Sequence, residues 1–68
     1  MGEEKREKMR KTMEELKNLV AKEVVPVKDL LDAGAMTECV HMNWAFREGN
    51  GNFRPTDLGK AMVGRQET

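Results

Sequence analysis

Aromatic residues and cysteine are scarce in this chain: its 68 residues include two phenylalanines, one tryptophan, one cysteine and no tyrosine. A single cysteine excludes a disulfide within the chain, and together with the one histidine it is too little for a structural zinc site. A core of this size rarely contributes more than about 3–5 kcal/mol of stability. Stability must therefore come from good packing or from association with another subunit.

The sequence also lacks net charge and long apolar runs. Its 12 basic and 12 acidic residues balance, and the pI is about 6.6. Domains held to nucleic acid by bulk charge are usually strongly basic, so this balance argues against that class. No apolar stretch approaches the roughly 18 residues of a membrane span, and the charged N-terminus does not resemble a signal peptide. We expect a cytoplasmic protein with no membrane partner.

What the chain does have is a long amphipathic pattern over residues 3–23. Its apolar side chains recur at steps of three and four, as on one face of a helix. They are Met9, Met13, Leu16, Val20 and Val24. Pro26 disfavours helical geometry at the residue before it, so the helix should end by Val24 or Val25. At about 1.5 Å per residue, this helix is long enough for its first turns to project beyond the core.

The apolar stripe has two interpretations. The simpler is that it covers the core of the domain. The alternative is an interface with a second copy of the chain or with a partner protein. The residues of that interface would be Met9, Met13, Leu16 and Val20.

The next segment, residues 26–33, has the pattern of a short second helix. Pro26 suits the first turn of a helix. Val27, Leu30 and Leu31 would share one face. Gly34 suits the left-handed position that follows the last turn. We predict a helix that ends at this glycine.

Residues 40–47 are ambiguous between strand and helix. Their side chains alternate between apolar and other types, which is typical of a half-buried strand. Met36, Val40 and Trp44 also have helical spacing, so a helix over residues 37–48 stays the alternative. A Gly-Asn-Gly turn follows, which favours a strand and a β-hairpin.

Two registers of this hairpin can be compared. In one, a loop of residues 49–50 places Phe46 opposite Phe53. In the other, whose loop lies one residue later, Arg47 and Arg54 face each other, and like charges in this position destabilise a sheet. The first register also gathers the apolar groups on one face. We predict the first register, with both phenylalanines in the core and both arginines facing solvent.

A last helix is predicted after the hairpin. Thr56 is a good N-cap residue and Asp57 a good acid for the first turn. Gly64 should end the helix. Residues 1–8 and 65–68 are expected to fray, as chain ends commonly do.

Three motifs in this order resemble the winged helix-turn-helix regulators. They are Leu30-Leu31-Asp32-Ala33-Gly34, then Gly49-Asn50-Gly51, then Phe53-Arg54-Pro55-Thr56-Asp57-Leu58-Gly59-Lys60. In that family such motifs end the recognition helix, form the wing and lead into the last helix. The resemblance implies one small winged-helix-like α+β domain over residues 1–68. Its parts are a long N-terminal helix, a short helix, a hairpin wing and a C-terminal helix.

The same resemblance implies a small DNA-binding transcriptional regulator, acting as a dimer through its wing and short helix. Arginines on a hairpin can reach phosphates or a narrow minor groove. The expected contacts to duplex DNA are Lys28, Arg47, Asn50, Asn52, Arg54 and Lys60. The alternative function is a protein-interaction module, such as an inhibitor or adaptor from a phage or mobile element, that binds its partner through the methionine-rich first helix. Charge neutrality favours this alternative.

The sequence does not have the pattern of an enzyme. Cys39 and His41 would share one face of a strand, yet no orienting carboxylate or oxyanion motif accompanies them. There is no phosphate-binding loop or cluster of metal ligands, and so small a chain has little room for a ligand pocket of about 300 Å³. We expect no enzymatic activity, no cofactor, no metal and no small-molecule substrate.

Overall fold

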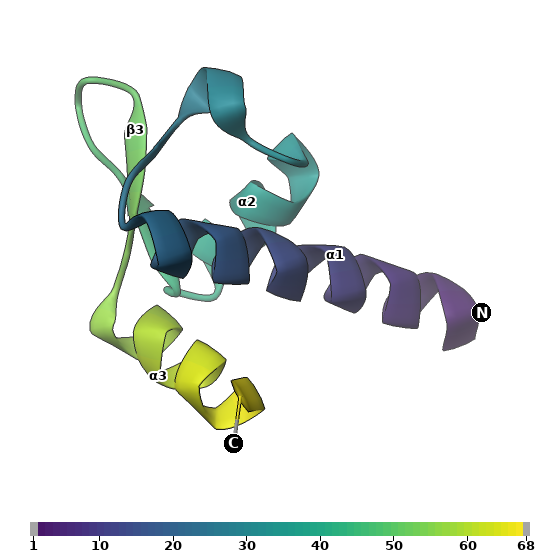
Figure 1. Cartoon of the computed structure of the whole chain (residues 1–68). Coiled ribbons are helices and arrows are strands. Elements are labelled where there is room, and N and C mark those ends of the chain that lie inside the picture. Colours follow the sequence, from purple (N-terminus) through teal and green to yellow (C-terminus); the bar gives the residue numbers. More distant parts are fainter. Residues whose placement is uncertain (1, 68) are drawn as a thin grey trace.

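The computed structural model describes residues 2–67, which form three α-helices, one 3-10 helix and a three-stranded antiparallel sheet (Figure 1). In chain order they are α1 (Gly2–Lys22), β1 (Val25–Pro26), η1 (Val27–Asp29), α2 (Ala33–His41), β2 (Ala45–Arg47), β3 (Asn52–Pro55) and α3 (Asp57–Glu67). The predicted α+β class, with its long N-terminal helix, hairpin and C-terminal helix, is confirmed. Met1 and Thr68, the outermost residues of the ends expected to fray, lie outside the described residues.

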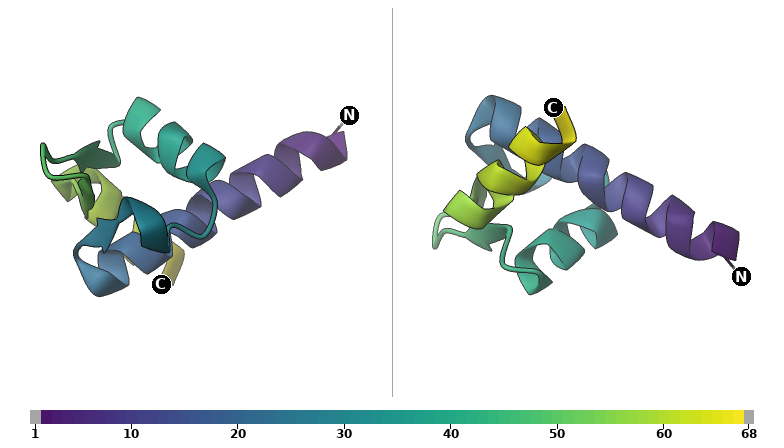
Figure 2. Two further views of the ribbon diagram at one scale, coloured as in Figure 1. Left: turned by 90° about the horizontal axis from the view of Figure 1, so that it is seen from above. Right: turned by 90° about the horizontal axis from the view of Figure 1, so that it is seen from below.

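Helix α1 forms where the stripe predicted it, and its two halves have different surroundings. In the second half Leu16 and Leu19 are fully buried. Residues 3–11 are all exposed, and this first half extends beyond the rest of the domain (Figures 1 and 2). The helix ends at Lys22, and Glu23 takes a left-handed conformation with a φ of 66°. The left-handed conformation of Glu23 therefore ends the helix before Pro26 can do so.

The core lies between the three helices and the inner face of the sheet. Its buried residues are Leu16, Leu19, Val25, Met36, Cys39, Trp44, Ala45, Phe53 and Val63. Full burial of one large apolar side chain contributes about 1.5–3 kcal/mol. Every α-helix and every strand supplies at least one member, whereas η1 supplies none.

The sheet has the order β1-β3-β2, so β3 is the central strand. Val25 of β1 lies opposite Phe53 of β3, and both side chains face the core. In the hairpin, the opposed pairs are Ala45 with Pro55, Phe46 with Arg54 and Arg47 with Phe53. Strand β1 thus ties the segment after α1 to the middle of the hairpin.

The hairpin register lies one residue away from both registers considered from the sequence. The amide of Glu48 donates to the carbonyl oxygen of Asn52 at 2.7 Å, which leaves residues 49–51 as a three-residue loop. Gly51 has a φ of 86°, the left-handed position that glycine takes in such loops. A shift of one residue reverses the facing of a strand. Phe46 is therefore 45% exposed, and the prediction that placed it in the core is wrong.

The short helix lies later in the chain than predicted. Residues 26–33 do not form a helix: Pro26 belongs to β1, η1 follows, and Leu30 is extended with a ψ of 139°. The helix α2 begins after Asp32, whose carboxylate accepts a hydrogen bond from the amide of Ala35 at 3.1 Å. An N-cap of this kind fixes the start of a helix. Gly34 consequently lies in the first turn of α2, and its prediction as a C-terminal cap is wrong.

The strand predicted for residues 40–47 is confirmed only for its last three residues. The first two residues of that segment belong to α2 instead. Met36 and Cys39 lie three residues apart and are both buried, as on the inner face of a helix. After the helix, Asn43 has a φ of 64° and turns the chain toward the hairpin. The amide of Trp44 then donates to the carbonyl oxygen of Cys39 at 2.8 Å.

Helix α3 begins as predicted, because the hydroxyl oxygen of Thr56 accepts a hydrogen bond from the amide of Gly59 at 3.0 Å. The prediction that Gly64 ends it is wrong, since α3 continues to Glu67. Glycine inside a helix costs about 1 kcal/mol but leaves the backbone hydrogen bonds intact. Gly59 has a packing role: a Cβ atom there would clash with the carbonyl oxygen of Trp44.

Candidate nucleic-acid and partner-binding surfaces

The hairpin end of the domain gathers most of the residues predicted to contact DNA. Four of them lie on the hairpin: Arg47, Asn50, Asn52 and Arg54. Lys28 lies on η1, whose Val27 amide donates to the carbonyl oxygen of Gly51 at 3.2 Å and so holds η1 beside the hairpin loop. Lys60 lies on α3, on the opposite side of α1 from η1 (Figure 1). Five of the six residues therefore share one end, and Lys60 does not.

The charges at this hairpin end are few and partly paired. The Nε atom of Arg54 donates to Oε1 of Glu48 at 2.7 Å. Asp29 follows Lys28 directly. Among residues 2–67, Arg47 has no ion-pair partner. Three cations against two carboxylates leave a net charge of one positive unit at this end.

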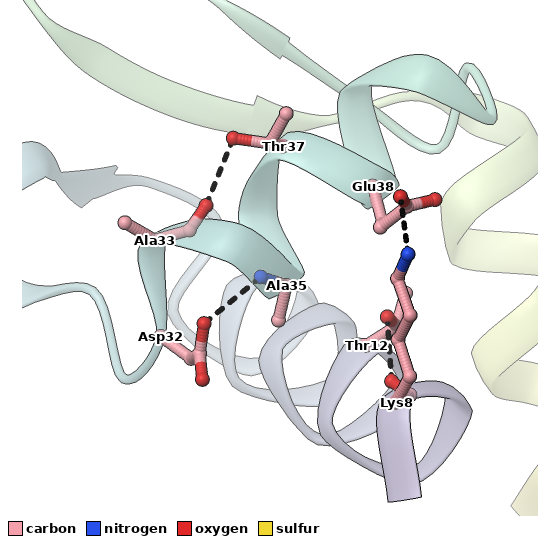
Figure 3. A network of polar contacts seen from close by, with 7 residues as sticks. All are labelled: Lys8, Thr12, Asp32, Ala33, Ala35, Thr37 and Glu38. Atoms are coloured by element: carbon pink, nitrogen blue, oxygen red, sulfur yellow. Dashed lines mark hydrogen bonds and ion pairs between the residues drawn. The ribbon is translucent and has the colours of Figure 1, made fainter. Parts of the chain in front are cut away.

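Helix α2, which precedes the hairpin, presents a small and uncharged surface. Its nine residues contain no lysine or arginine. The exposed ones are Ala33, Gly34, Thr37, Val40 and His41. The one acid of α2, Glu38, accepts from Nζ of Lys8 on α1 at 3.3 Å (Figure 3). DNA could approach α2 closely, because most of its exposed side chains are small. The helix would attract phosphate only weakly, because it has no lysine or arginine.

Glu15 positions the start of α2, and the sequence reasoning missed it. Its side chain is 1% exposed. Its carboxylate accepts hydrogen bonds from the amide of Leu31, at 3.1 and 3.2 Å to its two oxygens, and from the amide of Asp32 at 3.3 Å. A hydrogen bond to a charged group contributes about 1.5–3 kcal/mol. The available signal was helical phase, because Glu15 lies on the buried side between Thr12 and Leu19.

Cys39 is a core residue. Its Sγ atom donates to the carbonyl oxygen of Thr12 at 3.5 Å. Burial, followed by the charges of Glu15 and Glu38, raises the pKa of the Cys39 thiol to about 11. A thiol that stays protonated at neutral pH is not an activated nucleophile. Among residues 2–67, no group of three histidine, cysteine, aspartate or glutamate side chains could hold a metal ion.

The predicted partner interface on α1 is largely occupied by the domain itself. Leu16 is fully buried in the core, so it is not accessible to a partner. Met13 and Val20 are half-buried and pack against the core. Met9 alone of the four is exposed, with 53% of its surface accessible.

Met9 borders a shallow groove of about 260 Å³ between α1 and the C-terminal end of α2. Its apolar lining is Met9, Met42 and Trp44. Its polar lining consists of Thr12, which is buried, and of Lys5, Lys8 and Glu38 at the rim. Met42 is 46% exposed, whereas Trp44 is buried and forms the floor. We call this the methionine groove.

A second, larger groove of about 780 Å³ lies between α1 and the N-terminal end of α2. Most of its lining is charged or small, including Glu4, Glu7, Lys11 and Gly34. Lys8 and Glu38, whose ion pair is drawn in Figure 3, line both grooves.

Ion pairs join successive turns of α1 on its exposed surface. Arg10 contacts Glu7 at 2.5 Å and Glu14 at 3.2 Å. These contacts lower the pKa of Glu7 and raise that of Arg10. Exposed pairs of this kind contribute little to stability, because solvent screens their charges. Their effect is to support the helix, and they leave its surface open to a partner.

In the described part of the chain, no helix combines the length and hydropathy needed to cross a membrane. Comparisons with protein-family models, with curated proteins and with solved structures found no match. Function is therefore inferred from the two surfaces, the hairpin end and the methionine groove.

Proposed function

We propose that the protein is a small regulator that binds duplex DNA through its hairpin end. The observation that carries this proposal is the hydrogen bond from Val27 to Gly51, which holds Lys28 beside a hairpin that bears two arginines and two asparagines. The order of short helix, hairpin and C-terminal helix, which the resemblance to winged-helix regulators implies, supports it.

The chemistry of this end suits weak binding in which phosphate contacts dominate. Arginine and lysine neutralise phosphates and fix the register, whereas asparagine side chains can hydrogen-bond to base edges. The small exposed side chains of α2 allow close approach to a groove, but they add no cation. With Lys28, Arg47 and Arg54 as the three cations, log K should fall with log salt at a slope of about −2.7 for a monomer.

The proposal includes a dimer, because two copies double the number of phosphate contacts. The salt slope distinguishes the two states: a dimer that uses both hairpin ends should give about −5.4. Sedimentation at several protein concentrations measures the oligomeric state independently.

The proposal is tested by fluorescence anisotropy of labelled mixed-sequence duplex DNA over a salt series. We expect binding at low salt, which Arg47→Ala combined with Arg54→Ala abolishes. Glu48→Gln should tighten binding, because it frees Arg54 from its ion pair. Lys60→Ala, on α3, is the matched control and should leave the affinity within about twofold. Absence of binding at low salt, or an equal loss in the Lys60→Ala variant, would contradict the proposal.

A second candidate function is a protein-interaction module, and the methionine groove supports it. Met9 and Met42 are both exposed beside the buried ring of Trp44. Methionine side chains are flexible and polarizable, which suits adaptable contacts with partner helices. This function requires no net positive charge, in agreement with the balanced composition.

A further inference from the structure

The methionine groove continues the core of the domain onto the exposed half of α1. Trp44 belongs to the core and also forms the floor of the groove. Met9 lies seven residues before the fully buried Leu16, on the same face of the helix. The groove is therefore an apolar surface whose base, Trp44, is buried in the core, and within residues 2–67 no segment covers it.

The charged side chains that line this groove are Lys5, Lys8 and Glu38, and Arg6 follows Lys5 on α1 without lining the groove itself. Lys5 lies four residues before Met9 and Arg6 three, so both flank it on the same face of α1. Neither cation has an ion-pair partner among residues 2–67. The charge of Lys8, which lines the groove together with Lys5, is offset by Glu38. Two unpaired positive charges thus stand beside the methionines.

The acidic residues of the same half of α1 lie elsewhere. Glu4 and Glu7 line the larger groove and do not contribute to the methionine groove. Glu7 is in addition held by Arg10. The exposed half of α1 therefore has an apolar and basic side next to Trp44 and a mixed, largely acidic side away from it.

We propose that the methionine groove binds an acidic amphipathic helix of a partner protein. The inference rests on the second candidate function and names its partner class. Apolar side chains one turn apart on the partner would pack against Met9, Met42 and Trp44. Carboxylates beside them would face Lys5 and Arg6. An amphipathic helix laid in a hydrophobic groove is a common mode of recognition, and complementary charges at the rim fix partner choice.

A second copy of the chain is a poorer occupant than an acidic partner. In a two-fold symmetric dimer the same surface meets itself. Lys5 and Arg6 of both copies would then lie in one interface, and like charges opposite each other oppose association. The two unpaired cations, Lys5 on the rim and Arg6 beside it, favour a partner of opposite sign.

The test uses the full chain and three designed helical peptides of equal length. The first carries leucines on one face and glutamates on the other. The second replaces the glutamates with lysines, and the third replaces the leucines with serines. Fluorescence of Trp44, the one tryptophan of the chain, and the methyl NMR signals of Met9 and Met42 report on the groove.

We expect the acidic leucine peptide alone to shift these signals at saturating concentration. Lys5→Glu combined with Arg6→Glu should weaken its binding roughly tenfold, which corresponds to about 1.4 kcal/mol. Lys11→Glu is the control for a reversed charge on the same helix, because Lys11 lines the other groove. It should change the affinity by no more than about twofold.

The outcomes separate this inference from the function on which it rests. If the lysine peptide binds as well or better, the groove is an interaction surface but its acidic partner class is wrong. If the serine peptide binds equally, charge alone is responsible and the groove plays no part. If no peptide shifts Trp44, Met9 or Met42, the inference and the protein-interaction function both fail. A dimer in sedimentation that Met9→Ala disrupts would assign the groove to a second copy and overturn the inference.

Discussion

The two halves of α1 follow one continuous helical pattern, but only one of them is packed. Residues 12–22 bury Leu16 and Leu19, whereas residues 3–11 are exposed throughout. A helix of 21 residues is about 32 Å long, and the whole domain measures 37 × 25 × 17 Å. So small a core cannot cover the full helix. Periodicity therefore predicts which side of a helix is apolar, whereas the volume of the remaining chain decides how far along the helix that side is covered.

We expect the largest difference in stability when one large side chain is removed from each half of α1. Leu16→Ala should cost about 2–5 kcal/mol, because it leaves a cavity in the core. Since a core of this size supplies about 3–5 kcal/mol, this variant should be largely unfolded. Met9→Ala should change stability by about 0.5 kcal/mol or less, because its side chain is exposed. Urea denaturation monitored by circular dichroism measures both, and similar losses in the two variants would contradict the division of α1.

Two adjacent glutamates provide a sharper contrast within the packed half. Glu15→Gln should destabilise the domain by about 1–1.5 kcal/mol, because the amide oxygen of glutamine accepts from Leu31 and Asp32 more weakly than the carboxylate does. Glu14→Gln removes only an exposed ion pair with Arg10 and should leave the free energy of unfolding almost unchanged. The midpoints of urea unfolding report the difference. If the Glu14 and Glu15 variants unfold at the same midpoint, the buried carboxylate does not hold the loop before α2.

The pH dependence of stability measures how well the core shields the thiol of Cys39. This residue lies on α2 and contacts Thr12 in the packed half of α1. The pKa of its thiol rises from 9.0 to about 11 in the folded protein. A raised pKa of this kind contributes stability that is fully present below pH 9 and is lost as the pH rises through 11. We expect the unfolding free energy to fall over this window, and to fall less in Cys39→Ala. Equal slopes in the two proteins would show that the thiol is not shielded by the core.

Much of the fold was predictable because local signals and packing agree there. The stripe of α1, the Thr56 cap of α3 and the burial of Trp44 and Phe53 are confirmed. The apolar spacing and the capping residue each point to the structure that forms. A glycine alone does not end a helix: α3 continues through Gly64 to Glu67.

The region between Pro26 and Trp44 could not be predicted, because distant residues decide it. Glu15 holds Leu31 and Asp32 in an extended connection, and this contact spans 16 residues of sequence. Helix α2 then begins after its N-cap Asp32 and occupies the first two residues of the segment predicted as a strand. No local pattern in the segment itself reveals a carboxylate on another helix.

The candidate surfaces were predictable to different degrees. The hairpin residues lie together because the turn brings residues close in sequence to one tip. The Gly-Asn-Gly motif predicts this turn directly. The separation of Lys60 and the outward position of Phe46 depend on the direction of α3 and on a register one residue away from the prediction. The methionine groove joins Met9 to Met42 and Trp44 across two elements, so only the tertiary structure shows it.

Native-state hydrogen exchange along α1 tests the central contrast most directly. We predict that amides of residues 16–22 exchange only through global unfolding, while those of residues 6–11 exchange much faster through local opening, because few contacts hold this half. Uniform protection along the whole helix would contradict the account, since it would mean that the exposed half is already packed and has no open face for a partner.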